Sequence, residues 1–500
     1  MTLVTDYLDK SAEKYPDKIA FVNERRSITF SELRQEARHI AMGLIERKIF
    51  RCPVAIFLDK SPECVAAFMG VAYSGNFYTP LDIDMPQARI MKILQTLQPA
   101  VVITDKKHYE FLKASVKDVT IVVYEDFLQL SVDEVKLNAV TDKITDVDVI
   151  YVLFTSGSTG VPKGVIIPHK GVITYTEWCA EEFELDDSTI LGNQTPFYFS
   201  MSVLDIFQTL RNGCTTYIIP KKLFSFPIRL LQYLAEKKVN TIYWVPSALC
   251  IVANLRALGR VEVPSLQKIL FAGEVMPTKQ LNMWRKSFPK CLYADLYGPT
   301  ETTDICAFYK INRELSDSEP VPIGKACHNT GLLILDENGK LVENGQIGEL
   351  CVYGSTLAYG YYNNEEKTSI AFTQNPLQSC YPEIIYHTGD LVRYNEFGEL
   401  MYVTRKDFQI KHMGHRIELG EIETAVSSID GVDRCACVYD DKHSKIVLFY
   451  TGEIDGQSII DNLKNMVPGY MLPNRKEKLD KMPINLNGKI DRVALKDRLS

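Results

Sequence analysis

A run of hydroxyl, glycine and lysine residues follows a strongly apolar segment near position 150. Residues 150–154 predict a buried strand, and the residues after it include three glycines together with Thr155, Ser156, Ser158, Thr159 and Lys163. Glycines let backbone N–H groups approach an anion, hydroxyls donate to its oxygens, and a lysine supplies positive charge. The P-loop spacing of kinases and GTPases is absent, because Lys163 follows Pro162 and precedes Gly164. The segment predicts a phosphate-binding loop of another kind, with a plain surface turn as the alternative.

A second group of residues that could bind a ligand or take part in a reaction lies at 297–302, Tyr-Gly-Pro-Thr-Glu-Thr. A Gly-Pro turn would hold an aromatic ring, a hydroxyl and a carboxylate together. Tyr297 can stack on a base, Thr300 can bond a phosphate, and Glu301 can bind Mg²⁺, which prefers oxygen ligands. Further along, Asp390 can meet a pair of ribose hydroxyls. Lys489 lies in a tight turn, where a lysine on its own is usually solvated.

The elements that must position these residues alternate between strands and helices. Strand-like runs of this kind predict an α/β architecture with parallel sheet. The strand-like runs occur at 54–58, 100–104, 119–124, 215–219, 241–245, 268–271 and 291–296. A helix is expected at 62–73, and Ser31 is expected to be the N-cap of an earlier helix. Strands dominate from 324 to about 402, which predicts a β-rich subdomain. Helix, strand pair and helix patterns at 421–429, 435–440, 446–450 and 458–466 predict a small α+β domain.

Length and composition exclude several classes of protein. The chain has 500 residues, 46% hydrophobic and 24% charged, which fits a globular protein of two or three domains. A net charge of -7 argues against nucleic acid as a partner. No long apolar run or signal-peptide pattern occurs, so we expect no membrane segment and a cytoplasmic location. The 12 cysteines are scattered and are expected to be reduced, with no zinc spacing among them.

Further motifs lie in order along the chain, at 78–82, 272–274, 348–354, 414–423 and 468–473. With the segments above, they resemble adenylation domains of nonribosomal peptide synthetases, within the adenylate-forming (ANL) superfamily that includes acyl-CoA synthetases and firefly luciferase. The resemblance covers essentially the whole chain. In length and in the string Gln194-Thr-Pro-Phe-Tyr-Phe199, the chain is most similar to free-standing D-alanine:carrier-protein ligases.

The resemblance implies a large N-terminal adenylation core at 1–403 and a small mobile C-terminal domain at 404–500, with Asp407 as the hinge. It implies ATP and Mg²⁺ as cofactors. The residues implied for ATP binding are Thr155, Ser156, Gly157, Thr159, Gly273, Glu274, Asp295, Tyr297, Asp390 and Arg405. The catalytic residues implied are Lys489, Glu301, Thr300 and Lys163, and Glu301 is the metal ligand.

The implied reaction is attack of a substrate carboxylate on the α-phosphorus of ATP, which gives an acyl-adenylate and pyrophosphate. Mg²⁺ and Lys489 would offset the repulsion between the two anions. Rotation about Asp407 would then withdraw Lys489 and let a thiol attack the acyl carbon.

The expected acid pocket departs from the family pattern at one position. The family's Phe-Asp-x-Ser, whose aspartate pairs with the α-ammonium of an amino acid, reads Phe199-Ser200-Met201-Ser202 here. A buried ammonium without a counter-charge is costly, so the sequence favours an aryl acid, a β-amino acid or another simple carboxylic acid. The alternative is an amino acid held through the Ser200 hydroxyl and water. The pocket positions are Phe199, Ser200, Met201, Leu204, Trp244, Leu270, Ala272, Leu296 and Asp304, where Asp304 is placed to meet an amine.

The acyl acceptor is expected to be a separate acyl or peptidyl carrier protein, because no phosphopantetheine-type serine motif occurs before Ser500. An acyl-CoA ligase that uses coenzyme A is the first alternative. A catalytically inactive nucleotide-binding regulator is the second, and the presence of Lys163, Glu301, Asp390 and Lys489 together argues against it.

Overall fold

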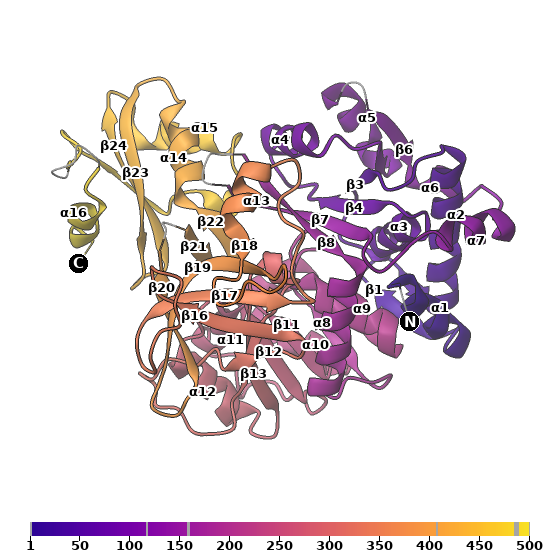
Figure 1. The fold of residues 1–500 in the computed structure, drawn as a ribbon, viewed down its shortest axis with the longest axis horizontal. Coiled ribbons are helices and arrows are strands. Elements are labelled where there is room, and N and C mark those ends of the chain that lie inside the picture. Colours follow the sequence, from indigo (N-terminus) through magenta and orange to yellow (C-terminus); the bar gives the residue numbers. More distant parts are fainter. Residues whose placement is uncertain (1–2, 117–118, 158–160, 407–408, 485–489, 500) are drawn as a thin grey trace. The chain divides into compact units, whose positions relative to one another are not determined.

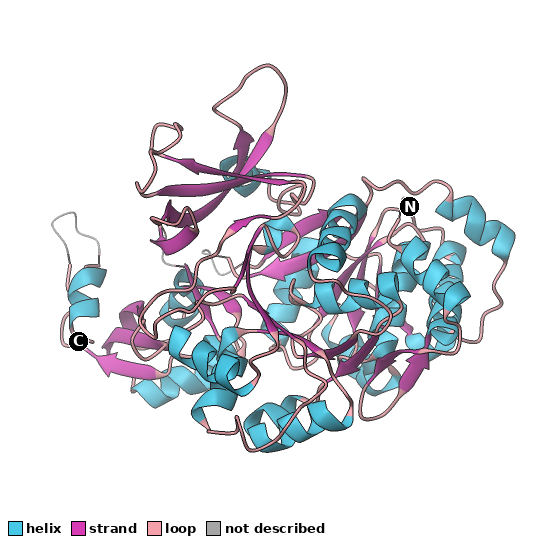
Figure 2. Ribbon diagram, turned by 90° about the horizontal axis from the view of Figure 1, so that it is seen from below, coloured by secondary structure: helices cyan, strands magenta, loops and turns pink. Residues whose placement is uncertain are grey.

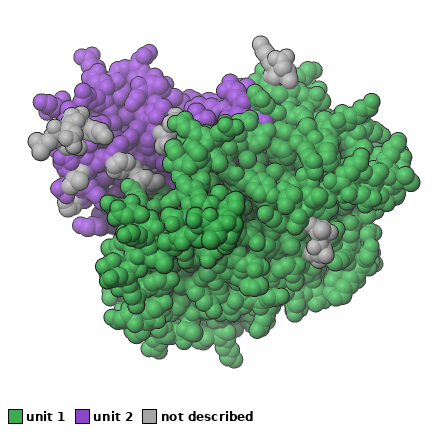
Figure 3. Space-filling view, viewed as in Figure 1, with its two compact units in different colours: residues 1–82, 98–153, 165–406 green, residues 83–97, 154–164, 407–500 purple. Residues whose placement is uncertain are grey.

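The structure is a computed structural model that describes residues 3–116, 119–157, 161–406, 409–484 and 490–499. The chain divides into two compact units, coloured separately in Figure 3. Unit 1 comprises Met1–Asp82, Gln98–Leu153 and Val165–Lys406, and unit 2 comprises Ile83–Leu97, Phe154–Gly164 and Asp407–Ser500. The expected loop at 155–163 therefore groups with the C-terminal segment.

A nine-stranded sheet forms the largest layer of unit 1 (Figure 1). Its order is β15 (Lys325–Ala326), β14 (Ala307–Lys310), β13 (Leu292–Tyr297), β12 (Lys268–Ala272), β11 (Thr241–Trp244), β9 (Ile190–Asn193), β10 (Thr215–Ile218), β1 (Ile19–Val22) and β2 (Ser27–Thr29). The strands from β13 to β1 are parallel, and the edges are antiparallel. The central strands are buried almost throughout, as expected for a parallel sheet covered on both faces.

A six-stranded sheet has the order β6 (Thr120–Val123), β5 (Val101–Thr104), β3 (Pro53–Phe57), β4 (Phe77–Leu81), β7 (Val149–Thr155) and β8 (Lys163–Pro168). Its strands from β6 to β7 are parallel. The two parallel sheets confirm the α/β class predicted from the alternating pattern.

Helices accompany these sheets, as Figure 2 shows in cyan. They are α1 (Thr5–Lys14), α2 (Phe30–Glu46), α3 (Pro62–Tyr73), α5 (Lys106–Ser115), α6 (Tyr124–Phe127), α7 (Glu134–Thr141), α8 (His169–Glu182), α9 (Ser202–Asn212), α10 (Pro227–Glu236), α11 (Pro246–Asn254) and α12 (Thr278–Ser287), with 3-10 turns η1 (Lys221–Ser225) and η2 (Thr300–Thr302). Helix α2 begins two residues earlier than expected: Thr29, not Ser31, is the N-cap, in a capping box with Glu32. Helix α9 ends at Gly213, whose φ of 71° suits a left-handed cap.

The β-rich part of unit 1 is an antiparallel sheet. It contains β16 (Thr330–Leu335), β17 (Gly348–Gly354), β18 (Phe372–Gln374), β19 (Ile384–Tyr394) and β20 (Leu400–Arg405), with α13 (Glu365–Ala371) beside β18. Strand β19 pairs with β17, β18 and β20, so it is the centre of this sheet. The predicted β-rich subdomain is confirmed.

Unit 2 contains α4 (Gln87–Leu97), the hairpin β21 (Gln409–His412) and β22 (His415–Glu418), α14 (Leu419–Ser427), β23 (Val432–Asp440), β24 (Lys445–Gly452), α15 (Gly456–Leu463), η3 (Gly469–Met471), β25 (Arg475–Lys478) and α16 (Arg492–Asp497). Its apolar core lies between the helices and the β23–β24–β25 sheet and includes Ile422, Leu448 and Leu463. This arrangement agrees with the predicted α+β composition of the C-terminal part.

Candidate functional site

The predicted phosphate loop begins at the end of β7, where the chain leaves the sheet. Thr155 Oγ1 is buried and has no hydrogen-bond partner among the described residues. A buried hydroxyl left unpaired is costly, so this atom has the capacity to donate to a phosphate oxygen. A side chain at Gly157 would place its Cβ 2.1 Å from the Val161 carbonyl oxygen, which explains the glycine there. Thr159 lies outside the described residues.

Within unit 2, the donors of this loop meet the segment around β22 and α14. Ser156 Oγ donates to the Arg416 carbonyl oxygen at 2.5 Å and accepts from the Glu418 backbone N–H at 3.2 Å. The Lys163 ammonium lies 3.5 Å from Glu418 Oε1, and both side chains are 11% exposed. The Gly157 N–H donates to Glu421 Oε2 at 3.3 Å. Two carboxylates therefore engage donors of the loop that the sequence predicts to bind phosphate.

A buried ion pair supports this arrangement from α4. The Arg89 guanidinium donates to the Glu421 carboxylate, and their side chains are only 4% and 5% exposed. Because Glu421 also accepts from the loop, Arg89 fixes the carboxylate that meets Gly157. Neither Arg89 nor Glu421 was expected from the sequence to belong to the site.

The predicted metal ligand, Glu301, lies in η2 and is fully buried. The Tyr361 hydroxyl donates to Glu301 Oε1 at 2.7 Å, and the Ala358 N–H donates to the Glu301 carbonyl oxygen at 2.8 Å. A carboxylate held in one orientation offers the oxygen ligands that Mg²⁺ requires. Tyr361 was missed in the sequence because it lies sixty residues away.

Next to Glu301, the Thr300 hydroxyl lies 3.4 Å from the Ser200 hydroxyl. Thr300 is the expected α-phosphate contact and Ser200 the altered pocket position. The fold therefore brings the expected nucleotide contact and the expected acid pocket together, although they are a hundred residues apart in sequence.

Three predicted nucleoside contacts form one connected group. Asp390 on β19 and Arg405 on β20 are cross-strand partners, and the guanidinium Nη1 lies 2.5 Å from Asp390 Oδ1. Arg405 also donates to the Thr388 carbonyl oxygen at 3.1 Å. The Tyr297 hydroxyl donates to Asp390 Oδ2, and burial together with this carboxylate raises the pKa of the Tyr297 phenol, which stays protonated as a donor. Asp390 is only 2% exposed, so its two oxygens are held in fixed directions.

The remaining predicted adenine contacts lie at the ends of neighbouring parallel strands. Asp295 on β13 is opposite Phe271 on β12 and is 6% exposed. Gly273 follows β12 with a φ of 92°, a backbone conformation that favours glycine. The Glu274 carboxylate accepts from the Ser247 N–H at 2.8 Å, which ties the start of α11 to this segment.

Most predicted pocket residues are deeply buried. Phe199 and Ser200 are half-buried, whereas the apolar residues that belong to the main core cluster are Met201, Leu204, Trp244, Leu270, Ala272 and Leu296. The Trp244 indole N–H donates to the Gly192 carbonyl oxygen at 2.7 Å, which fixes the ring. These residues are thus firmly positioned by packing, and their contact with a substrate stays a prediction.

Asp304 is 2% exposed and is held by two phenols that the sequence did not reveal. The Tyr175 and Tyr243 hydroxyls donate to Asp304 Oδ2 at 3.0 and 2.9 Å. Asp304 has a φ of 77°, in the left-handed region, and follows a residue with the same feature. Strained backbone of this kind persists only where its surroundings hold it, and it is frequent at functional sites.

Two other predicted residues, Lys489 and the hinge Asp407, lie outside the described residues.

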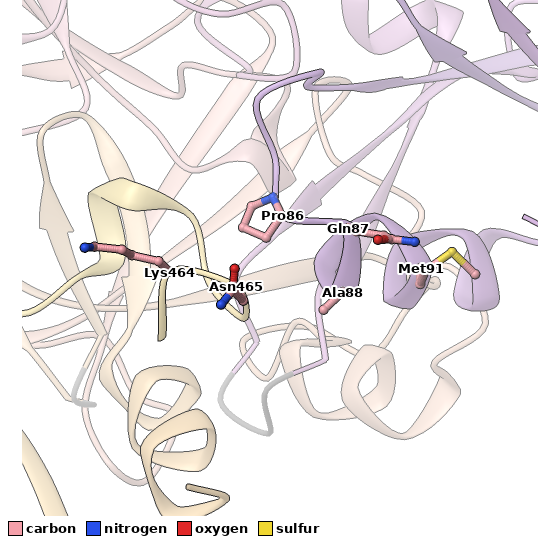
Figure 4. A pocket seen from close by; sticks show the side chains of 6 residues that line it. All are labelled: Pro86, Gln87, Ala88, Met91, Lys464 and Asn465. Atoms are coloured by element: carbon pink, nitrogen blue, oxygen red, sulfur yellow. The ribbon is translucent and has the colours of Figure 1, made fainter. Parts of the chain in front are cut away.

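A separate cavity of about 410 Å³ lies in unit 2, between the start of α4 and the turn after α15 (Figure 4). Its lining residues are Pro86, Gln87, Ala88, Met91, Lys464 and Asn465. None of them was predicted as a site residue.

The sequence pattern of one protein family, described as AMP-binding enzyme, matches residues 8–362. The chain belongs to this family of AMP-binding enzymes. The match includes the loop after β7, η2 and the strands that carry Gly273, Asp295 and Tyr297. It confirms the adenylate-forming superfamily and the enzyme class expected from the sequence, an AMP-forming ligase.

Relatives of this AMP-binding enzyme cover nearly its whole length. An L-proline--[L-prolyl-carrier protein] ligase of Streptomyces coelicolor is 33% identical over 467 residues, 88% of this chain and 86% of that protein. Delta-poly-L-ornithine synthetase of Acinetobacter baumannii is 33% identical over 99% of the chain. The chain spans only 37% of that synthetase, and only 44% of tyrocidine synthase 1 of Brevibacillus parabrevis.

Solved structures agree in fold. The Vibrio cholerae adenylation domain AlmE, in complex with glycyl-adenosine-5'-phosphate, has a TM-score of 0.86 at 22% identity, over 99% of this chain and 97% of that one. The o-succinylbenzoate CoA synthetase of Bacillus subtilis has a TM-score of 0.84 at 21% identity, over 98% of both chains. The AMP-binding enzyme described here shares their fold. In the part of the chain that the structure describes, none of the helices is long and apolar enough to span a bilayer.

Proposed function

We propose that this chain activates a small carboxylic acid with ATP, forming an acyl-adenylate and pyrophosphate, and then transfers the acyl group to the phosphopantetheine thiol of a separate carrier protein. A carboxylate oxygen would bond to the α-phosphorus while the bond from this phosphorus to the pyrophosphate oxygen breaks. The thiol sulfur would then bond to the acyl carbon while the bond from this carbon to the AMP oxygen breaks, so that AMP leaves and the thiol proton passes to solvent.

The observation that carries this proposal is the approach of Thr300 to Ser200, at 3.4 Å between hydroxyl oxygens. Attack on phosphorus requires the two reactants to be held within contact distance in a fixed orientation. The hydroxyl expected to contact the α-phosphate lies beside a residue of the expected acid pocket, which supports such an arrangement. Thr300 and Ser200 are themselves half-buried, so both hydroxyls can be reached by the reactants, while Met201 and Glu301 beside them are buried.

The adenosine end of ATP would be bound by the Tyr297, Asp390 and Arg405 group. Its rigidity supports this role, since Arg405 and the Tyr297 hydroxyl hold the Asp390 carboxylate for two ribose hydroxyls. Asp295 and the Gly273–Glu274 backbone would contact the adenine edge. Such preorganised groups lower the entropy lost when the nucleotide binds.

The phosphate end would be bound by Thr155, Ser156, Gly157 and Lys163. In this arrangement the triphosphate must replace Glu418 and Glu421, whose carboxylates now engage Lys163 and the Gly157 N–H. Glu301 would hold Mg²⁺, which supplies positive charge to offset that of the phosphates. Lys489 would pair with the substrate carboxylate, and Asp407 would act as the hinge between the two half-reactions. Rotation at this hinge would move the proposed C-terminal domain, 404–500, relative to the proposed N-terminal core, 1–403.

The proposed acid lacks an α-ammonium, because Ser200 offers a hydroxyl where a carboxylate would be needed. Aryl acids, β-amino acids and other simple carboxylic acids fit this pocket, and an α-amino acid held through the Ser200 hydroxyl is the alternative. For a β-amino acid, Asp304 is the residue to meet the amine. Asp304→Asn keeps an oxygen acceptor for Tyr175 and Tyr243, so it removes charge with little loss of packing.

Substrate saturation with Asp304→Asn distinguishes these acids. If the preferred acid carries an amine, the KM for it should rise at least about tenfold, because a buried ion pair is lost. If the preferred acid is an aryl acid, the KM should be unchanged. A loss of kcat with both kinds of acid, at unchanged KM, would contradict a role for Asp304 in substrate binding.

The proposed acceptor is a carrier protein, and the similarity to the prolyl-carrier protein ligase of Streptomyces coelicolor supports it. An acyl-CoA ligase is the second candidate, and its support is the shared fold with a CoA synthetase. Mass spectrometry after incubation with ATP, the acid and either a phosphopantetheinylated carrier or coenzyme A would identify the thioester formed. Absence of both acyl-adenylate and thioester would favour a nucleotide-binding regulator instead.

A further inference from the structure

Three potential metal ligands meet in the β-rich sheet of unit 1. Glu349 and Cys351 are on β17, two residues apart, and His387 is directly opposite Cys351 on β19. The register shifts between Glu349 and Cys351, which is the mark of a β-bulge. A carboxylate oxygen, the thiol sulfur and an imidazole nitrogen all lie within 4.8 Å of one another.

The two separations from His387 Nδ1 fit one small cation shared with Glu349 and Cys351. His387 Nδ1 lies 3.1 Å from Glu349 Oε2 and 3.3 Å from Cys351 Sγ. Tetrahedral zinc with ordinary bond lengths separates a nitrogen from an oxygen ligand by about 3.4 Å and from a sulfur ligand by about 3.6 Å. Both separations from His387 are therefore within a few tenths of an ångström of the values for a shared ion, and the Glu349 oxygen and the Cys351 sulfur lie within 4.8 Å of each other.

Neighbouring groups already orient two of these side chains. His387 Nε2 lies 3.0 Å from the Thr373 hydroxyl, and the Gly389 N–H donates to Glu349 Oε1 at 3.1 Å. Such outer hydrogen bonds fix which ring nitrogen and which carboxylate oxygen face a metal. Here they leave His387 Nδ1 directed at both Glu349 Oε2 and Cys351 Sγ.

We propose that Glu349, Cys351 and His387 form a binding site for one Zn²⁺ ion, with water in the fourth position. Nitrogen, sulfur and oxygen ligands in one set suit zinc better than the hard cations Mg²⁺ and Ca²⁺. The site is separate from the proposed Mg²⁺ ligand Glu301 and does not depend on the proposed reaction.

One charged side chain next to Glu349 must move away when the ion binds. The Lys406 ammonium lies 3.1 Å from Glu349 Oε2, but its side chain is 43% exposed, so it can turn into solvent. The buried Cys351 thiol must also lose its proton, which passes to solvent as the sulfur–zinc bond forms. The site is reached from the His387 side, since that side chain is 30% exposed.

Cobalt substitution tests the proposal on the whole chain. The protein is freed of metal by a chelator, kept reduced with a phosphine and titrated with Co²⁺, whose bond to a thiolate gives a strong near-ultraviolet absorption band. We expect the band to saturate at one equivalent and to disappear when Zn²⁺ is added. Cys351→Ser should abolish it, whereas Cys380→Ser, at an exposed cysteine, should leave it unchanged.

A second variant separates a metal site from an ordinary ion pair. His387→Arg keeps a hydrogen-bond donor that can pair with Glu349, but it removes the imidazole ligand. We expect it to weaken Zn²⁺ binding at least about tenfold, measured by competition with a chromophoric chelator. The exposed His328→Ala is the matched control and should bind as the unaltered chain does. No thiolate band in the unaltered chain, or unchanged Zn²⁺ affinity in His387→Arg, would overturn the proposal.

Discussion

Glu418 is predicted to compete with ATP for Lys163, and Glu418→Gln is the change that tests this. The ammonium and the carboxylate lie 3.5 Å apart, and each side chain is 11% exposed. At an effective dielectric constant near 20, two unit charges at that distance attract by about 5 kcal/mol before desolvation is considered. Hydrogen bonds to charged groups contribute a net of about 1.5–3 kcal/mol in proteins.

If ATP must break this pair, its removal should strengthen ATP binding by that net amount. The dissociation constant should fall by about tenfold to about 150-fold. Glutamine at 418 retains an oxygen for the Gln409 amide, which donates to Glu418 Oε1 at 2.5 Å, so the hairpin should stay folded. Isothermal titration with ATP in the absence of acid measures the effect directly.

Two further variants make the measurement specific. Glu453→Gln removes one negative charge from an exposed position of unit 2 and should leave ATP binding unchanged. Lys163→Met should weaken binding and cancel the gain from Glu418→Gln, since the two changes then act on one interaction. If folded Glu418→Gln binds ATP with an affinity within twofold of that of the unaltered protein, Glu418 does not compete with ATP for Lys163.

Two other predictions concern the metal ligand and the acid stability of unit 1. Tyr361→Phe removes a hydroxyl 2.7 Å from the Glu301 carboxylate; the Mg²⁺ concentration for half-maximal activity should change by about tenfold or more, and an unchanged Mg²⁺ titration would contradict this role. Burial lowers the pKa of His169 to about 4, below its value near 6.5 in an unfolded chain. Between pH 6.5 and pH 4, His169 therefore binds a proton in the unfolded chain but not in the folded chain. This difference lowers the free energy of unfolding by up to about 1.4 kcal/mol for each pH unit. His169→Asn should therefore lose less Tm between pH 7 and pH 5 in calorimetry, and an equal loss would disprove the effect.

Local pattern predicted many of the elements well. The expected strands at 54–58 and 241–245 correspond to β3 (Pro53–Phe57) and β11 (Thr241–Trp244), and the expected helix at 62–73 is α3 (Pro62–Tyr73). These segments are buried on all sides and read as continuous apolar runs, a signal that is local in sequence. The N-cap of α2 was wrong by two residues, because Thr29 and Ser31 have equal capping chemistry and only Thr29 has Glu32 three positions later.

Contacts between distant segments could not be predicted in this way. The sequence suggested Thr300, Glu301 and Asp390 by their local motifs, but not Tyr361, which orients Glu301. Glu421 lies in the motif at 414–423, and nothing in the motif itself indicates that it meets Gly157 and Arg89. Such partners are set by how strands and helices pack, so one sequence without a structure does not reveal them.

The most direct test of the central claim is acid-dependent exchange of labelled pyrophosphate into ATP across a panel of α-amino, β-amino, aryl and fatty acids. Exchange reports reversible formation of an acyl-adenylate and needs no acceptor. We expect clear exchange, strongest with an acid that has no α-ammonium. Strongest exchange with an α-amino acid such as alanine would contradict the role given to Ser200, and no exchange with any acid would contradict the proposed reaction.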